Sequence, residues 1–314
     1  MIVVTGGYGF IGSNLVHALN QRGRDDIWVV DDLTDGRKFV NLVGATVADY
    51  HHWSDFPQRF AQTAARGVSI DAVYHLGACS DTLEWDGRRM MAANFEFSRD
   101  LLDTCEHHQI PLIYASSAAV YGLSEVCVEA PAYERPLNVY GYSKLAFDQH
   151  VRYRLPNLRT RVVGLRYFNV YGPREQHKGR MASVMYHFDQ QLRGGASLAL
   201  FGASHGVAAG EQSRDFVFVD DVVAQTLWFG SETSVSGIFN CGTGSAATFN
   251  DVAQAVVAHH GHGTIQYIPF PVELLGAYQH RTCADLRAAR HAGFNLPLRN
   301  VTQGVRVYLD RLRP

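Results

Sequence analysis

The sequence has few cysteines, no long apolar run and almost no net charge. Its 314 residues include five cysteines, at Cys79, Cys105, Cys127, Cys241 and Cys283. This odd, scattered set lacks the paired spacing of a zinc site and argues against a disulfide framework. No run of about 18 apolar residues is present that could cross a bilayer. A strand pattern begins at residue 2, so we expect no apolar leader and a cytoplasmic protein with reduced thiols.

The charge balance excludes some classes of partner. The chain has 28 Lys and Arg against 30 Asp and Glu, a formal net charge of −2. Nothing in this balance attracts nucleic acid or an anionic membrane, so small soluble partners are expected. Histidine is frequent, but His259, His260 and His262 have no carboxylate or thiolate cluster beside them. We therefore expect no metal site.

The first positive signal is a β-branched strand that runs directly into three spaced glycines, in the opening segment IVVTGGYGFIG. Gly6 permits a turn that a Cβ would obstruct, Gly9 lets backbone amides approach a phosphate, and Gly12 allows close helix packing. The N–H groups that open the following apolar helix, which starts with Phe10 and Ile11, then face the anion. The segment predicts a dinucleotide-binding site.

Strand-like and helical patterns alternate through the first half of the chain. We expect strands over 27–30, 72–76, 112–115 and 162–168, with helices around 10–22, 88–105 and 140–155. This alternation is typical of a Rossmann-type doubly wound parallel sheet, and hence of the α/β class.

The second half of the chain is less regular. We assign residues 1–170 to a dinucleotide-binding domain and 171–314 mainly to a smaller C-terminal substrate-binding lobe. Segments near 214–245 are expected to return to the sheet. The loop 205–213 is rich in Gly and Ala, and we predict that it is mobile.

A second signal is the segment YGYSK, which places Tyr140 and Lys144 on one face of a helix. A phenol has a pKa near ~10, and a neighbouring ammonium favours the phenolate and so makes it a usable base. The same spacing also fits a surface tyrosine packed over a lysine stem. Ser117 follows an expected strand, where open α/β sheets bind ligands, and can hydrogen-bond a substrate oxygen.

The end of the second strand carries the signal for the cofactor. Asp31 lies about 20 residues after the glycine loop, where an acid usually binds the ribose hydroxyls of NAD. Arg37 and Lys38 follow closely and could neutralise the 2′-phosphate of NADP. From these residues alone, both cofactors remain open.

In combination, these motifs resemble the extended short-chain dehydrogenase/reductase family, in which the glycine fingerprint, the serine and the Tyr-x-x-x-Lys pair follow in this order. The strings EWDG, PLNVYGYSK and FNVYGPRE followed by HKG are similar to those of its ADP-L-glycero-D-manno-heptose 6-epimerases. The resemblance covers essentially the whole chain. It implies an NADP-dependent isomerase that inverts C6 of an ADP-heptose in lipopolysaccharide core biosynthesis.

The resemblance also implies a route and an assembly. The route is transient oxidation to a C6 aldehyde, followed by return of hydride to its other face from a tightly held cofactor. Tyr140 and Lys178 are implied as the two acid/base groups, with Ser117 positioning the substrate and Lys144 holding cofactor and phenolate. The implied assembly is a homopentamer.

Further contacts are carried over residue by residue. The expected cofactor contacts are Gly6, Gly9, Phe10, Ile11, Gly12, Asp31, Asp32, Lys38, Leu76, Gly77, Ala78, Cys79, Ser80, Asn94, Lys144, Val170 and Lys178. The expected substrate contacts are Ser117, Asn169, Arg180, His187, Phe201, Gly202, Ala203, Ser204, Arg214 and Tyr278. Arg214 is the expected diphosphate partner, because a guanidinium pairs bidentately with phosphate oxygens.

Some positions depart from the family pattern. Asp32 stands where asparagine is usual and Trp53 where a lysine is usual, which leaves NAD open beside NADP. Gly202 and Ala203 replace a Glu-Gly pair, and the loop before Arg214 is longer, which weakens the adenine-side assignment.

Three alternative functions can be weighed. A UDP-sugar 4-epimerase shares the motifs up to Tyr140. A dehydratase is disfavoured, because Ala118 and Ala119 stand where such enzymes carry carboxylates. A dinucleotide-sensing protein is disfavoured, because Ser117 and Tyr140 are both present.

Overall fold

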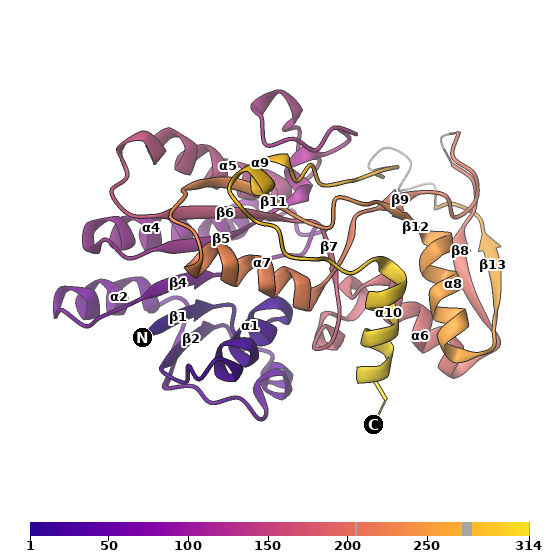
Figure 1. The fold of residues 1–314 in the computed structure, drawn as a ribbon, viewed down its shortest axis with the longest axis horizontal. Coiled ribbons are helices and arrows are strands. Elements are labelled where there is room, and N and C mark those ends of the chain that lie inside the picture. The colour runs from indigo at the N-terminus through magenta and orange to yellow at the C-terminus, as the bar shows by residue number, and fades with distance from the viewer. Residues whose placement is uncertain (205, 272–277, 314) are drawn as a thin grey trace.

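A seven-stranded sheet forms the centre of the protein, which a computed structural model describes over residues 1–204, 206–271 and 278–313 (Figure 1). Its order is β11-β6-β5-β4-β1-β2-β3, and all its strand pairs are parallel. The strands are β1 (Ile2–Thr5), β2 (Ile27–Asp31), β3 (Asp49–His52), β4 (Ala72–His75), β5 (Leu112–Ser117), β6 (Val162–Tyr167) and β11 (Gly237–Cys241). The doubly wound α/β fold is therefore confirmed.

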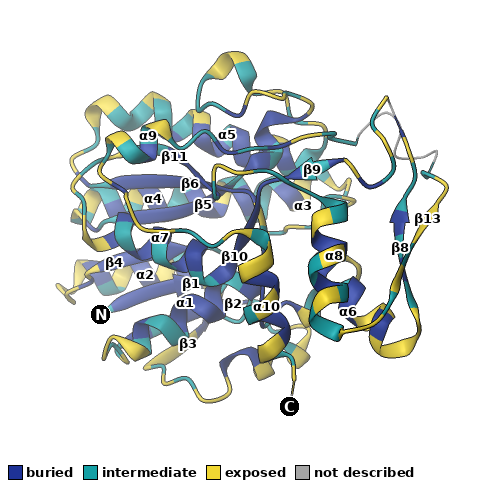
Figure 2. Cartoon of the chain, turned by 45° about the vertical axis from the view of Figure 1, so that its right-hand side comes forward, coloured by how far each residue is buried: buried dark blue, intermediate teal, exposed yellow. Residues whose placement is uncertain are grey.

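Helices cover both faces of this sheet. Val4 belongs to the core beneath α1 and α7, whereas its neighbour Val3 belongs to the core beneath α2, α4 and α5. Figure 2 accordingly shows the inner strands, such as β1, β5 and β6, buried as a layer between helices, as is usual for parallel sheets. The bounds are α1 (Phe10–Gln21), α2 (Phe56–Ala65), α4 (Phe97–His108), α5 (Val139–Arg154) and α7 (Val219–Ser231).

The helix expected over 88–105 is not uniform. It consists of α3 (Gly87–Met91), a π-helical turn (Ala92–Glu96) and α4. Such π turns are rare and are often found at functional sites.

The remaining elements lie mostly at the right of Figure 1. β8 pairs in parallel with β13, and α6 and α8 pack together beside them. The short pairs β7 with β10 and β9 with β12 connect this part to the central sheet. The bounds are β7 (Asn169–Tyr171), α6 (Val184–Gly194), β8 (Ser197–Phe201), β9 (Ser213–Arg214), β10 (Phe216–Phe218), β12 (Ala247–Thr248), α8 (Phe249–His260), β13 (Thr264–Ile268), α9 (Arg287–His291) and α10 (Val301–Arg311).

The predicted division at residue 170 stays a prediction, although α7 and β11 do return to the sheet after the second part begins. In the loop 205–213, His205 lies outside the described residues. Two other residues of the loop make hydrogen bonds: Gln212 is buried and donates to Ser204 Oγ over 3.2 Å, and the carbonyl of Ala209 accepts from Asn250 over 3.0 Å. Its mobility remains a prediction.

Candidate functional site

A cleft of about 630 Å³ lies along the carboxyl ends of β1, β2, β4, β5 and β6. Clefts of this size and position are typical of cofactor and substrate sites in open α/β sheets. The predicted residues that line it are Gly6, Gly9, Phe10, Ile11, Gly12, Asp31, Asp32, Lys38, Leu76, Gly77, Ala78, Cys79, Ser80, Ser117, Tyr140, Lys144, Val170 and Lys178.

The glycine turn leaves no room for side chains. A Cβ on Gly6, where φ is +68°, would lie 2.7 Å from the backbone nitrogen of Gly77. A Cβ on Gly12 would lie 2.1 Å from the carbonyl oxygen of Gly6. The first N–H groups of α1 therefore meet a backbone-walled cradle that fits the pyrophosphate of a dinucleotide.

A buried hydrogen-bond chain supports this cradle from behind. The amide of Gly77 donates to Thr5 Oγ1 over 3.0 Å, and Thr5 Oγ1 lies 2.7 Å from His75 Nδ1. His75 Nε2 lies 2.7 Å from Ser98 Oγ, which donates to the carbonyl of Asn94. Because the Ser98 proton is used on that carbonyl, His75 donates from Nε2 and accepts at Nδ1. Burial, reinforced by a nearby lysine charge, lowers the pKa of His75 to about 3.

Asn94 belongs to the π turn and lies behind the cleft instead of lining it. Its side chain accepts from the amide of Cys79 over 2.8 Å and donates to the Cys79 carbonyl and to Ser143 Oγ, each over 2.9 Å. Asn94 thus holds the segment that carries Cys79, and its predicted contact with the cofactor stays a prediction.

The carboxylate of Asp31, at the end of β2, is surrounded by hydrogen-bond donors. It is buried and accepts from the amide of Tyr8 over 2.8 Å, from the amide of Asp32 over 2.7 Å and from Lys38 Nζ over 2.6 Å. The carboxylate of Asp32 is half exposed and accepts from the amide of Thr34. The two adjacent acids therefore differ in surroundings and in what they can bind.

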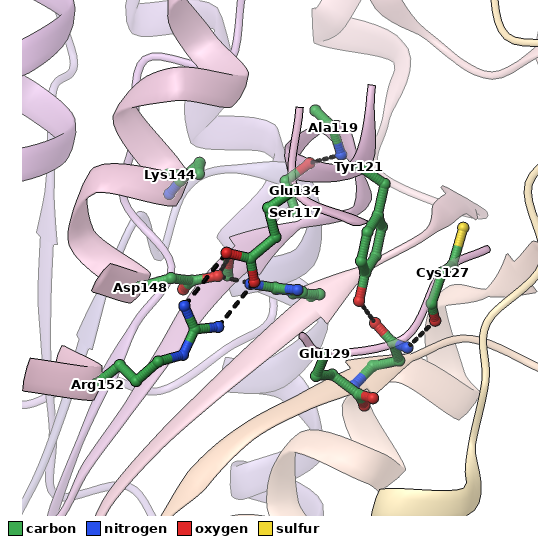
Figure 3. Close-up of polar contacts among 12 residues, drawn as sticks. Ser117, Ala119, Tyr121, Cys127, Glu129, Glu134, Lys144, Asp148 and Arg152 are labelled. Carbon is green, nitrogen blue, oxygen red and sulfur yellow. Dashed lines mark hydrogen bonds and ion pairs between the residues drawn. The ribbon is translucent and has the colours of Figure 1, made fainter. Parts of the chain in front are cut away.

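Ser117 ends β5, Tyr140 lies in the first turn of α5, and their side chains interact. The side chain of Asn138 caps α5 by accepting from the amide of Gly141 over 2.8 Å, which fixes Tyr140 in the first turn. Ser117 Oγ accepts from the amide of Ala119 over 3.1 Å, as Figure 3 shows. Burial raises the pKa of Tyr140, and a hydrogen bond with Ser117 opposes this shift.

The expected effect of Lys144 on this phenol is not present in the structure. Lys144 Nζ donates to the carbonyl of Ala115 over 2.8 Å. Burial lowers the pKa of Lys144 to about 8, while Asp148 and Cys79 oppose that change. In this arrangement burial outweighs the remaining influences on the pKa of both groups.

A buried ionic cluster lies next to Lys144 on α5 (Figure 3). Asp148 accepts from Arg166 Nε over 2.9 Å, and Arg166 also pairs with Glu134, which pairs with Arg152 over 2.7 Å. Two acids and two bases balance there. Removing Arg166 would leave the fully buried carboxylate of Asp148 without this ion-pair partner, which is costly.

Lys178 lies in the 3₁₀ turn Gln176–Met181 and lines the same cleft. Its ammonium is 5.2 Å from the ring centroid of Phe10. Burial lowers the pKa of Lys178, and the charge of Glu175 opposes this shift. The cleft therefore brings all four predicted catalytic residues together.

The predicted substrate residues other than Ser117 form no part of this lining. The rings of Phe201 and Tyr278 meet edge to face with centroids 6.5 Å apart, and the guanidinium of Arg214 lies 4.9 Å from the Tyr278 centroid. Arg180 instead pairs with Asp81 over 3.5 Å. The other predicted substrate residues are dispersed: Asn169 is exposed on β7, His187 packs beside Tyr186, the amide of Gly202 donates to Ile268, Ala203 is exposed, and Ser204 is buried.

Sequence reasoning missed several residues of the cleft, among them Arg89, Phe97, His177 and Met181. The position of His177 beside Lys178 was a usable signal. No sequence signal pointed to Phe97, because its position follows from the π turn that directly precedes α4.

The described ranges contain no group of three His, Cys, Asp or Glu side chains suited to a metal ion. His260 instead lies 3.0 Å from Asp189. Within the same ranges, no helix combines the length and apolar character needed to span a bilayer.

Comparison with known proteins agrees with this geometry. Residues 2–242 match the NAD dependent epimerase/dehydratase family. The chain is 58% identical over 310 residues to the ADP-L-glycero-D-manno-heptose-6-epimerase of Alkalilimnicola ehrlichii, covering 99% of this chain and 97% of that one.

Solved structures show the same likeness. The Helicobacter pylori ADP-L-glycero-D-manno-heptose-6-epimerase has a TM-score of 0.85 at 29% identity, over 99% of this chain and 95% of that chain. The Thermus thermophilus UDP-glucose 4-epimerase, solved with NAD, has a TM-score of 0.79 at 26% identity, over 99% and 98%. The chain belongs to the NAD dependent epimerase/dehydratase family.

Proposed function

We propose that this protein is an isomerase that converts ADP-D-glycero-D-manno-heptose to ADP-L-glycero-D-manno-heptose for lipopolysaccharide core biosynthesis. The observation that carries this proposal is the cleft in which Ser117, Tyr140 and Lys178 lie beside the glycine cradle. The 58% identity with an enzyme of that name supports the choice of substrate.

The chemistry of C6 favours a redox route. Its hydrogen is not adjacent to a carbonyl, so a side chain of ordinary basicity cannot remove it as a proton. A nicotinamide dinucleotide held in the cradle supplies a reversible hydride acceptor. Since C6 bears carbon on both sides, at C5 and C7, its oxidation gives a ketone. The C6 aldehyde expected from the resemblance is therefore replaced by a C6 ketone.

Two proton-transferring groups suit an inversion, because the C6 oxygen points in different directions before and after it. One of Tyr140 and Lys178 takes the hydroxyl proton as C6 is oxidised. The other returns a proton to the oxygen as hydride adds to the opposite face, so no proton or hydride is consumed overall. Ser117 hydrogen-bonds the oxygen, and Lys144 holds the cofactor ribose.

For the cofactor we propose NADP. Lys38 lines the cleft, where its ammonium pairs with Asp31 over 2.6 Å, and the exposed Arg37 next to it in the chain pairs with Asp35 over 2.8 Å. These charges suit a 2′-phosphate, and the carboxylate of Asp32 is held by Thr34. NAD is the alternative, supported by the buried acceptor Asp31. Parallel titrations with NADP and NAD, followed by fluorescence of the reduced forms, decide between them.

For the nucleotide end of the substrate we propose Arg214 and Tyr278, which lie together with Phe201. The guanidinium suits a diphosphate, and the aromatic rings offer a stacking surface for a base. We further propose a cytoplasmic homo-oligomer, a pentamer, whose mass light scattering coupled to size-exclusion chromatography measures directly.

The test of the function is incubation of the purified protein with ADP-D-glycero-β-D-manno-heptose, with the C6 configuration followed by NMR. Appearance of the L-glycero epimer without net formation of reduced cofactor is the expected result. Absence of conversion, with turnover of UDP-glucose to UDP-galactose instead, would contradict it and favour a 4-epimerase.

A further inference from the structure

Glu175 is a fully buried carboxylate within the loop 172–183, which carries Lys178. Its Oε1 accepts from the amide of Gly172 over 3.3 Å and from Ser183 Oγ over 2.6 Å. Its Oε2 accepts from the amide of Ser183 over 2.6 Å. One side chain therefore joins the two ends of the segment 172–183.

The same residue also acts inside the loop. Its carbonyl accepts from the amide of Lys178 over 2.9 Å. The ammonium of Lys178 lies over the aromatic ring of Phe10, which gives it no hydrogen-bond acceptor. The placement of its ammonium in the cleft therefore depends on the backbone path, and Glu175 holds that path at the beginning, at the end and at Lys178 itself.

Glu175 is also the charge that acts on Lys178. Its negative charge raises the pKa of Lys178 against the lowering by burial. Around the pair, burial and then the charges of Lys38 and Lys178 lower the pKa of His177. From α10, Tyr308 faces Glu175, and burial together with that carboxylate raises the pKa of Tyr308.

We infer that Glu175 is a positioning residue for Lys178: it closes the loop 172–183 so that the ammonium reaches the cleft, and it supplies the opposing charge for proton transfer there. This inference rests on the proposed function, in which Lys178 is one of the two acid/base groups.

Glu175→Gln keeps the shape of the side chain but removes its charge. We expect kcat for the heptose to fall at least tenfold, with KM changed less than twofold. The limb of the pH profile of kcat that is set by Lys178 should move to lower pH, because loss of a nearby negative charge lowers an ammonium pKa.

Two matched variants separate the effect of the Glu175 charge on Lys178 from its effect in closing the loop 172–183. Ser183→Ala removes one hydrogen bond to Glu175 but keeps the charge, so that limb should stay at the wild-type pH. Glu175→Asp also keeps the charge but shortens the side chain by one methylene. Its kcat should fall at least fivefold with the limb unmoved, and it decides the question if the Gln variant does not fold.

The inference is overturned if the pH profile of kcat for Glu175→Gln superimposes on that of the wild type. It is also overturned if Ser183→Ala shifts the Lys178 limb as much as Glu175→Gln does, or if Glu175→Asp keeps the wild-type kcat. Failure of the proposed function looks different. The wild-type protein would then not epimerise the heptose, or Lys178→Met would keep wild-type kcat.

Discussion

Acid should destabilise this protein through His75. The imidazole is 2% exposed, and its pKa falls from an ordinary 6.5 to about 3 in the folded protein. Between these values the unfolded chain binds a proton that the folded protein does not, so the free energy of unfolding decreases as pH falls. At ~1.36 kcal/mol per pKa unit, the contribution is complete above pH 6.5 and has lost about 2 kcal/mol at pH 5.

The measurement is urea unfolding of the wild type and of His75→Gln at pH 7.5 and pH 5. Glutamine can donate to Ser98 and accept from Thr5 but does not titrate in this range. The wild type should therefore lose about 2 kcal/mol more than the variant between the two pH values, a large part of a typical stability of roughly 5–15 kcal/mol. Equal losses in both proteins would refute the argument, because other groups would then account for the acid sensitivity.

Three other predictions concern the cleft. Gly12→Ala should abolish cofactor binding in calorimetry, since its Cβ would lie 2.1 Å from a carbonyl oxygen. The control Gly36→Ala, whose Cβ would have open space around it, should bind the cofactor normally. Equal affinities of the two variants would contradict the assignment of the glycine turn as the cofactor site. Tyr140→Phe should lower kcat by about 10²–10⁴ with cofactor affinity unchanged, and a smaller loss would remove Tyr140 from proton transfer. Lys38→Ala should weaken NADP at least tenfold more than NAD, and an equal effect on both would exclude Lys38 from phosphate binding.

Local sequence patterns predicted the centre of the fold well. β1, β2, β4 and α1 are strongly apolar and periodic, so their positions follow from short-range rules. β3 was missed because its residues Asp49–His52 are mostly polar and exposed. It exists through its pairing with β2, which no local pattern reveals.

The functional site, like the fold, has parts that local sequence patterns predict and parts that only the folded chain reveals. The glycine turn and the Tyr-Lys pair were predictable because each acts within a few residues. The ionic cluster was not, because Glu134, Asp148 and Arg166 come from separate parts of the chain and meet only in the folded protein. The direction of the Tyr140 pKa shift was unpredictable for the same reason, since burial depends on the whole surrounding fold.

The position of β11 at the edge of the sheet has a consequence during synthesis. β6 pairs with β5 on one side and with β11 on the other, and β11 is synthesised about 70 residues after β6. At roughly 5–20 residues per second, the apolar edge of β6 stays unpaired for about 4–14 s. An apolar strand with an unpaired edge can pair with strands of other chains and so aggregate. The nascent protein is therefore most exposed to aggregation in this interval, and a ribosome stalled before residue 241 would prolong it.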